Sequence, residues 1–504
     1  MVLAFPGFNA GFLAFVAMLP LFYALDGKRG PEAFFIAYTA GVVFFFGTVW
    51  WLVHVTLPGM IVLVLYLALY FGIFGALVSL GLCPSRYVSS RALSYISLFL
   101  IPAGWVTCEW LRSHIFGGFG WVALGYSQSA SLPLIQIADI TGVYGVSFVI
   151  VMVNIAIFLT LKSQQEKEAV MDIAMVIAII VIFICLIYGY IRLNNIFTGE
   201  RLKVGVVQGN IPQDEKWDQD LRNRIMDKYE GLTKRLAKHK VDLIIWPETS
   251  IPGFVETEPD LLDRMKKLVL EVKTPLLAGT LRENPAVKDL YFNSASLFLP
   301  DGHIADTYDK IHLVPFGEYV PFKHVFSFVE KIAPVPIGDV TKGKEYTVFS
   351  YLLQRNAKEK DVVLKLTKNV RFSCLICFED MFPELAREFV RKGAGFLVNI
   401  TNDAWYKKTS AAWQHAQGSI FRAVENRVAL VRATNTGVSC FIDQKGKVLN
   451  VIKRGDEALF VDGYGETEII MTNIWTFYNV YGDIFAYLCI FATIILLYTA
   501  VLVK

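Results

Sequence analysis

The chain has 504 residues, of which 54% are hydrophobic and only 18% are charged. A soluble globular chain carries about 25% charged residues, so this composition excludes an intrinsically disordered chain, and seven cysteines are too few for a disulfide scaffold. The net charge of +3 is too small to indicate a nucleic-acid partner. The composition therefore fits a membrane protein with a soluble part attached.

The charged residues are concentrated in one part of the chain. Residues 1–195 hold 8 Lys or Arg and 7 Asp or Glu, whereas residues 196–480 hold 39 and 37. A helix needs about 20 apolar residues to cross the hydrocarbon layer. Stretches of about that length occupy residues 7–25, 33–54, 59–82, 92–111, 140–161, 173–191 and 484–503. We therefore expect a membrane domain of about six transmembrane helices at 1–195, a soluble domain at 196–480, and a C-terminal transmembrane helix within 481–504.

Lys and Arg residues indicate which loops face the cytoplasm. They follow the first, third and fifth spans, at Lys28, Arg29, Arg86, Arg91, Lys162 and Lys167. The second and third spans are expected to be joined by an uncharged turn at Leu57–Gly59. This pattern leaves both the N-terminus and the soluble domain outside the cytoplasm. The Gly-rich, aromatic stretch 113–138 is expected to form a re-entrant or interfacial loop beside the outer leaflet.

Short β-branched runs alternate with polar helical stretches in the soluble section. The predicted strands are 203–208, 241–246, 275–279, 294–299, 370–376, 396–400 and 431–442. The predicted helices are 221–239, 259–273, 381–392 and 411–430. Residues 335–369 look like a long surface loop. This alternation predicts an α/β domain in which helices cover sheets.

Two charged side chains lie in apolar surroundings. Glu248 comes just after the predicted strand 241–246, which places it at the carboxyl edge of a sheet, where α/β folds bind ligands. Lys310 lies with Glu318 in an apolar, proline-rich loop, where charges are costly unless they pair or act on a substrate. Taken alone, Glu248 could equally begin a helix or loop, and Lys310 could be solvated.

Cys377 lies where the predicted strand 370–376 runs into a helix. A helix N-terminus lowers the pKa of a thiol and so favours a nucleophile. Cys374 is three residues earlier, and residues three apart in a strand face opposite sides, so a disulfide or redox pair is not expected. No Cys and His spacing suits zinc, and we expect no metal site. An inert, buried Cys377 is the simpler alternative.

Three segments, in this order, resemble the carbon–nitrogen hydrolase (nitrilase) superfamily: Trp246-Pro247-Glu248, the loop 310–318, and Ile376-Cys377-Phe378-Glu379. A nitrilase-like domain placed after a multispan N-terminus and before one last helix is similar to the apolipoprotein N-acyltransferase family. The similarity covers nearly the whole chain. It includes the segments 3–9, 125–128, 142–148, 208–213, 402–405 and 432–435.

The resemblance implies a polytopic α-helical membrane domain with an αββα sandwich domain, a Glu248–Lys310–Cys377 triad and no cofactor. It also implies acyl transfer in two steps through a thioester. The donor would be a phospholipid, typically phosphatidylethanolamine, and the acceptor the α-amino group of the S-diacylglyceryl cysteine that begins an apolipoprotein. The implied location is the bacterial inner membrane, as a multi-pass protein whose catalytic domain is periplasmic.

The same resemblance assigns roles within the site. Glu248 would accept the thiol proton and later that of the attacking amine. Lys310 would stabilise the oxyanion. Glu318 matches a further functional glutamate of the family and is expected to orient Lys310 or Glu248.

Further residues match functionally important positions of the family, namely Trp217, Phe378 and Glu379, and Trp405 is expected to support the site. Packing for the aromatic residues and a helix N-terminal charge for Glu379 are the simpler roles. Phe378 replaces the usual Tyr of the family, and Trp405 is followed by Tyr406-Lys407 where the family often has an aromatic residue and Gly. The family commonly has eight spans, and this sequence predicts seven, so we expect that an N-terminal span is either missing or lost to a late start site.

Two other functions share parts of this pattern. A membrane-anchored amidase or nitrilase would use the same triad, with water resolving the acyl-enzyme, but a soluble substrate needs only one membrane anchor. A non-catalytic lipid- or lipoprotein-binding protein would not need all three triad residues. The N-acyltransferase is therefore the favoured hypothesis.

Overall fold

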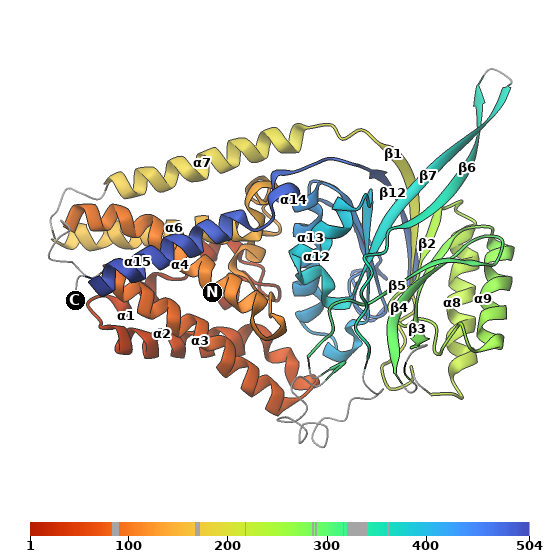
Figure 1. Cartoon of the computed structure of the whole chain (residues 1–504), viewed down its shortest axis with the longest axis horizontal. Helices are drawn as coiled ribbons and strands as arrows, with labels where there is room; N and C mark the ends of the chain where they lie inside the picture. Colours follow the sequence, from red (N-terminus) through yellow and green to blue (C-terminus); the bar gives the residue numbers. More distant parts are fainter. Residues whose placement is uncertain are drawn as a thin grey trace. The chain divides into compact units, whose positions relative to one another are not determined.

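The computed structural model describes residues 1–82, 90–166, 172–216, 218–284, 287, 290–315, 317–319, 340–359 and 362–502 (Figure 1). The contacts divide the chain into two compact units. The first comprises Met1–Ile196, Thr409–Glu425 and Thr476–Lys504, and the second comprises Phe197–Lys408 and Asn426–Trp475. The predicted domain boundaries, which assigned 411–430 to the soluble domain, stay a prediction.

The first unit is helical. Its α-helices are α1 (Leu19–Leu25), α2 (Gly30–Val49), α3 (Leu57–Leu82), α4 (Ser90–His114), α5 (Leu132–Ile135), α6 (Ala138–Glu166), α7 (Asp172–Asn194), α13 (Ala411–Asn426), α14 (Phe477–Tyr481) and α15 (Ile484–Leu502). Its 3-10 helices are η1 (Val2–Ala4), η2 (Gly11–Phe15), η3 (Trp50–His54), η4 (Ile115–Gly117) and η5 (Leu124–Gln128).

Four helical segments among the described residues are long and apolar enough to cross a membrane: Gly30–His54, Leu57–Leu80, Ala138–Gln164 and Ile173–Asn194. Gly11–Leu25 and Ile484–Thr499 are apolar but shorter. The described residues therefore contain several long apolar helices, as expected of a membrane domain, although only four of the seven predicted spans meet this criterion.

Two details of the predicted spans are wrong. The first predicted span is not a continuous α-helix, because η2 and a turn precede α1. The predicted turn at Leu57–Gly59 is instead the start of α3, and the break lies at Val55 and Thr56. Pro58 is tolerated there because the first turn of a helix has no intrahelical partner for its N–H.

The second unit contains two six-stranded mixed sheets. The first has the order β12-β1-β2-β3-β4-β5 and the second β11-β10-β9-β8-β7-β6. The strands of the first are β1 (Glu200–Gln208), β2 (Leu243–Ile245), β3 (Leu276–Glu283), β4 (Tyr291–Phe298), β5 (Ile304–Asp309) and β12 (Gly463–Met471). The strands of the second are β6 (Phe349–Glu359), β7 (Val362–Ile376), β8 (Phe396–Thr401), β9 (Ala429–Thr434), β10 (Cys440–Ile442) and β11 (Val448–Val451).

Each sheet has three parallel strands at its centre. These are β1, β2 and β3 in the first sheet, and β7, β8 and β9 in the second. Strands β2 and β8 are buried at every position, as parallel strands covered on both faces are. Because the carboxyl ends of parallel strands lie at one edge of a sheet, the loops that follow β2, β7 and β8 are available to form a site.

Helices complete the second unit. Helices α8 (Arg222–Ala237) and α9 (Pro259–Val272) lie beside the first sheet (Figure 1). They bury their apolar faces against it, with Met226 and Met265 fully enclosed. Helix α12 (Pro383–Arg391) packs beside β7 and β8. The expected α/β domain of helix-covered sheets is confirmed.

Two predictions about the second unit are wrong. The predicted strand 431–442 is two strands, β9 and β10, which pair antiparallel. The stretch 335–369, predicted as a surface loop, contains β6 and the first half of β7, which form a long antiparallel hairpin. The Pro and Gly residues at the start of this stretch, such as Pro336 and Gly343, concealed the strands that follow. Residues 335–339 of that prediction lie outside the described residues.

Candidate active site

The side chains of the candidate site come from the ends of several strands. Lys310 directly follows β5, Cys377 directly follows β7, and Asn402 directly follows β8. Glu248 lies three residues after β2, and its main chain passes close to β3. A Cβ atom on Gly279 would lie 2.4 Å from the Pro247 oxygen, so only glycine permits this approach.

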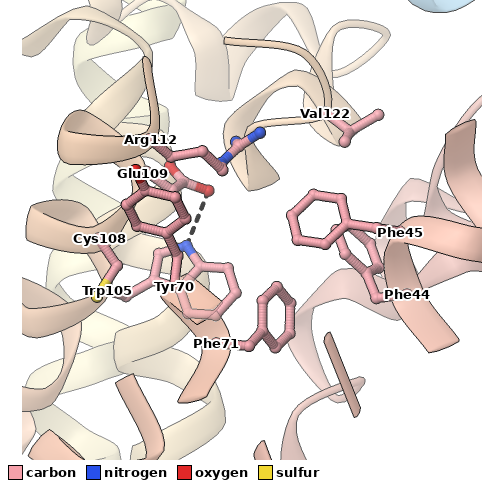
Figure 2. A pocket seen from close by; sticks show the side chains of 9 residues that line it. All are labelled: Phe44, Phe45, Tyr70, Phe71, Trp105, Cys108, Glu109, Arg112 and Val122. Carbon is pink, nitrogen blue, oxygen red and sulfur yellow. Dashed lines mark hydrogen bonds between the residues drawn. The ribbon is translucent and has the colours of Figure 1, made fainter. Parts of the chain in front are cut away.

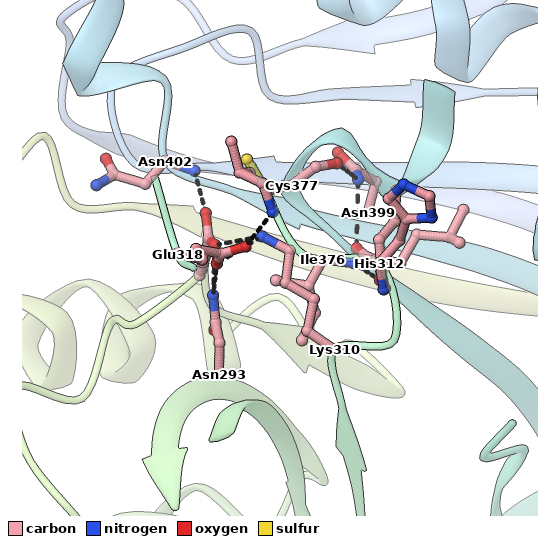
Figure 3. A network of polar contacts seen from close by, with 12 residues as sticks. Asn293, Lys310, His312, Glu318, Ile376, Cys377, Asn399 and Asn402 are labelled. Carbon is pink, nitrogen blue, oxygen red and sulfur yellow. Dashed lines mark hydrogen bonds and ion pairs between the residues drawn. The ribbon is translucent and has the colours of Figure 1, made fainter. Parts of the chain in front are cut away.

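The carboxylate of Glu248 is buried and held on both oxygens. Oε1 accepts from Asn293 Nδ2 at 2.8 Å, and Oε2 accepts from the main-chain N–H of Asn402 at 2.9 Å (Figure 3). The side chain is only 7% exposed. Its orientation is therefore fixed by groups from two different sheets.

Lys310 lies between two carboxylates. Its Nζ donates to Glu318 Oε1 at 2.8 Å and is 3.7 Å from Glu248 Oε1 (Figure 3). Burial alone would lower the pKa of Lys310, but the Glu318 and Glu248 charges outweigh burial and raise the pKa above its ordinary value. Lys310 is therefore a permanently charged ammonium, suited to stabilising negative charge.

Cys377 starts the 3-10 helix η7 (Cys377–Met381) in a left-handed backbone conformation, with φ of 57°. Such a conformation is costly for a residue with a side chain and is found preferentially at functional sites. Cys377 is half-buried, whereas Cys374 is fully buried, and neither cysteine is in a disulfide. The expectation that these two cysteines do not pair is confirmed.

The expected direction of the Cys377 pKa shift is wrong. Burial and the nearby Glu248 carboxylate raise the pKa of the thiol, and Lys310 only partly opposes them. The short η7 helix does not compensate for this. The thiol is therefore protonated at rest, and it needs a nearby base before it can act as a nucleophile.

Glu379 connects the Lys310 loop to the Cys377 strand. Its Oε1 accepts from the main-chain N–H groups of Ile311 at 2.8 Å and His312 at 2.9 Å, and its Oε2 accepts from that of Ile376 at 2.7 Å. The carboxylate is fully buried. Glu379 thus joins the two segments that carry the ammonium and the thiol, which is more than the helix N-terminal charge considered from the sequence.

A buried polar network lies behind Cys377. Asn399 Nδ2 donates to the Cys377 carbonyl at 2.8 Å, and Asn399 Oδ1 accepts from Arg432 Nη1 at 2.7 Å. Arg432 also pairs with Asp380 at 2.9 Å and with Asp403 at 3.4 Å. All of these side chains are buried. The network fixes the backbone that presents the thiol.

The structure brings most, but not all, of the predicted site residues together. Glu248, Lys310, Cys377, Glu318 and Glu379 form one cluster. The Phe378 ring joins them, with its centroid 5.5 Å from Lys310 Nζ. Trp405, in η8 (Asp403–Tyr406), is 40% exposed, and the contacts of the described residues do not connect it to the triad. Trp217 lies outside the described residues.

Sequence reasoning missed two residues that contact the triad. Asn293 Nδ2 donates to both Glu248 Oε1 and Glu318 Oε1, at 2.8 and 3.1 Å. Lys216 Nζ donates to the Glu248 main-chain oxygen at 3.0 Å. The available signals were a polar residue inside the strand β4 and a lysine beside the family-matching Trp217. Within the described ranges, no group of three His, Cys, Asp or Glu side chains could hold a metal ion.

A separate small cavity lies in the first unit. Figure 2 shows its lining: Phe44, Phe45, Tyr70, Phe71, Trp105, Cys108, Glu109, Arg112 and Val122. Glu109 Oε1 accepts from Trp105 Nε1 and from the Leu124 N–H, at 2.8 and 2.7 Å. Arg112 Nη1 donates to the carbonyls of Phe119 and Trp121. These two residues of α4 therefore hold the Gly-rich stretch that was predicted to be a loop.

Comparisons with known proteins agree with this architecture. Residues 1–156 match the family model of the apolipoprotein N-acyltransferase N-terminal domain, and residues 203–461 match that of carbon-nitrogen hydrolase. The second match, with the two mixed sheets and the buried Glu, Lys and Cys cluster, places the second unit among the carbon-nitrogen hydrolase domains.

Whole-chain relatives define the family more narrowly. An apolipoprotein N-acyltransferase of Geobacter metallireducens is 37% identical over 97% of this chain and 91% of that protein. One from Rhizobium rhizogenes is 32% identical over 92% of this chain and 87% of that protein. Among solved structures, the chain is similar to Saccharomyces cerevisiae Nit3, a member of branch 10 of the nitrilase superfamily, at 19% identity, a TM-score of 0.39, and coverage of 56% and 95%. The chain belongs to the apolipoprotein N-acyltransferase family.

Proposed function

We propose that this protein N-acylates apolipoproteins by a Glu248–Lys310–Cys377 triad, with a phospholipid as acyl donor. The observation that carries the triad is the placement of Lys310 Nζ between the buried Glu248 carboxylate and the partly buried Glu318 carboxylate, close to the partly exposed residue Cys377. The long apolar helices of the first unit support a membrane setting, in which both lipid substrates would be at hand. Phosphatidylethanolamine is the proposed donor.

In the first step, Cys377 Sγ attacks the ester carbonyl of the donor while Glu248 accepts the thiol proton. Lys310 stabilises the oxyanion that forms. The carbon–oxygen bond then breaks, and the leaving glycerol oxygen takes the proton from Glu248. The products are a lysophospholipid and a thioester on Cys377.

In the second step, the α-amino group of the S-diacylglyceryl cysteine attacks the thioester. Glu248 accepts a proton from the attacking nitrogen, the carbon–sulfur bond breaks, and the thiolate is reprotonated. Glu318 holds Lys310 in place during both steps. Catalysis would occur on the periplasmic side of the bacterial inner membrane.

Mass spectrometry of the full-length protein with phospholipid alone tests the proposal. We expect an acyl group on the peptide that contains Cys377, and we expect a diacylglyceryl peptide, but not water, to discharge it. Loss of the acyl group to water at a comparable rate would favour a membrane-anchored carbon–nitrogen hydrolase. A failure to load Cys377 under any donor would refute the triad.

A further inference from the structure

Lys216 is a second buried lysine at the candidate site, and the proposed acyl transfer does not use it. Its side chain is 3% exposed. Its Nζ donates to the main-chain oxygen of Glu248 at 3.0 Å, and this carbonyl is the polar partner found for Nζ in the described part of the chain. Burying an ammonium against one neutral acceptor is costly, so the surroundings must compensate for its charge.

The position of Lys216 is fixed by the loop that carries it. Ile211 exchanges two main-chain hydrogen bonds with the Asn435 side chain, at 2.7 and 2.8 Å. Gln213 Oε1 accepts from Asn402 Nδ2 at 2.7 Å, and the main-chain N–H of Asn402 also donates to Glu248. The same residue therefore holds the lysine's loop and the carboxylate, which gives the two groups a defined relationship.

The charges of the triad explain why a second cation is tolerated. Glu248 and Glu318 contribute two negative charges, and Lys310 contributes one positive charge, which leaves one uncompensated negative charge in a buried site. Lys216 offsets this negative charge. The groups within electrostatic range of Cys377 are Lys216, Glu248, Lys310, Asp403 and Tyr406, and those within range of Lys216 are Glu248 and Cys377.

Asp403 and Tyr406 lie beside this cluster. Asp403 shares Arg432 with Asp380, at 3.4 and 2.9 Å, so these three groups add negative charge near Cys377. Burial and nearby carboxylates raise the pKa of Tyr406 well above its ordinary value, so this hydroxyl stays neutral. Proton transfer from Cys377 to Glu248 moves a negative charge within the cluster without changing its sum. Lys216 thus offsets one negative charge of the cluster both before and after that step.

We propose that Lys216 is a positioning residue for the reaction: its buried ammonium holds the main chain at Glu248 and balances the excess negative charge of the triad, so that Cys377 can give up its proton. This proposal deepens the proposed function and rests on it for the role of Cys377 as nucleophile. It predicts an effect on the thiol that can be measured without any acyl transfer.

The loss of the Lys216 charge with rising pH gives the proposal a measurable pH dependence. Burial lowers the pKa of Lys216 to about 8, although the charges of Glu248 and Cys377 favour its charged form. The ammonium is therefore present below about pH 8 and is lost as the pH rises above it. The stabilisation that the Lys216 ammonium gives to the Cys377 thiolate must therefore be lost over the same pH range.

The experiment is alkylation of Cys377 by iodoacetamide in the full-length protein, followed by mass spectrometry of the Cys377 peptide from pH 6.5 to 9.5. At pH 7, we expect Lys216→Met to react about tenfold more slowly than wild type, which corresponds to a rise of about one unit in the thiol pKa. Above about pH 9, the two rates should converge because the wild-type lysine is then neutral.

Lys216→Arg provides the second arm, because a guanidinium stays charged over the whole range. It should react like wild type below pH 8 and faster than wild type above pH 9. Lys238→Met, the same change at an exposed lysine of the second unit, is the matched control and should follow wild type throughout. If Lys216→Met fails to fold, the comparison of Lys216→Arg with wild type tests the proposal by itself.

Identical pH profiles for wild type, Lys216→Met and Lys216→Arg would overturn the proposal. So would a Lys216→Met rate that is lower by the same factor at every pH, since this would indicate a structural role only. Acyl loading of wild-type Cys377 is measured separately. Suppose that the Lys216 variants change the alkylation rate as expected but Cys377 of the wild type is never acylated. This result would refute the proposed function and leave the role of Lys216 intact.

Discussion

The Tyr308 hydroxyl donates to both carboxylate oxygens of Glu379, at 2.9 Å from Oε1 and 3.0 Å from Oε2. Together with three main-chain N–H donors, this contact fully surrounds a carboxylate whose side chain has no exposure. Burial nevertheless raises the pKa of Glu379 from its ordinary value of 4.5 to about 7. Glu379, which joins the Lys310 loop to the strand that precedes Cys377, therefore titrates near neutral pH.

This titration predicts a pH-dependent stability difference. The folded state binds the Glu379 proton more tightly than the unfolded chain, so the resulting stability is fully present below about pH 4.5 and is lost as the pH rises through about 7. Glu379→Gln cannot titrate. The wild-type free energy of unfolding should therefore fall relative to that of the variant by up to roughly 3 kcal/mol between pH 5 and pH 8.

Thermal unfolding of both proteins at pH 5, 6.5 and 8 would measure this difference. Parallel changes in Tm with pH would contradict it. Glu388→Gln, the same change at a glutamate outside the cluster, serves as control.

Replacement of Cys377 by Ser should abolish acyl loading, by about three orders of magnitude or more, because an alcohol beside Glu248 is a much weaker nucleophile than a thiolate. Cys374→Ala is the matched control. Its thiol is fully buried in β7, so the change should cost stability through a small cavity and leave acyl loading unchanged. Loading that depended on Cys374 instead would show that the wrong nucleophile was chosen.

Asn293 should be essential for the arrangement of the two glutamates. Asn293→Asp would place a third carboxylate beside Glu248 and Glu318 and should abolish acyl loading through like-charge repulsion. Asn293→Ala removes only the bridging donor and should reduce the loading rate about 10- to 100-fold. Rates measured by mass spectrometry at one pH distinguish the two, and an Asp variant as active as the Ala variant would argue against the charge repulsion.

Arg432 should matter for folding more than for chemistry. Arg432→Met leaves Asp380 and Asp403 buried without their cation, which costs about 3–5 kcal/mol. We expect a lower Tm and reduced expression of the full-length protein. Arg454→Met, at an exposed arginine whose nearest carboxylate is 3.5 Å away, should leave Tm nearly unchanged. Equal Tm values for the two variants would refute the structural role of the network.

The three residues of the proposed triad were conspicuous because each follows an apolar strand or lies in an apolar loop, and the family resemblance then grouped them. Strand β8 was predicted to within one residue because it is short, β-branched and buried, whereas β1 begins three residues before its predicted start. The hairpin of β6 and β7 was not predicted, because the Pro and Gly residues before it, such as Pro336 and Gly343, made the whole stretch read as a loop.

The remaining features depend on contacts that are distant in the sequence. Asn293 lies 45 residues after Glu248 in the sequence, and nothing local indicates that it bridges two glutamates. The role of Glu379 arises from main-chain groups of Ile311 and His312. The pKa of Cys377 was expected to fall because its helix start was visible in the sequence, whereas its burial and the nearness of Glu248 were not.

The residues of the proposed triad differ in exposure, and this difference has a consequence for inhibitor design. Glu248 and Lys310 are 7% and 1% exposed, while Cys377 is the most exposed residue of the three. An electrophilic drug should therefore reach Cys377 more readily than the charged pair. Warheads selected for a protonated, poorly ionised thiol, and shaped like an acyl chain, should discriminate this enzyme from the many proteins whose reactive cysteines are already thiolates.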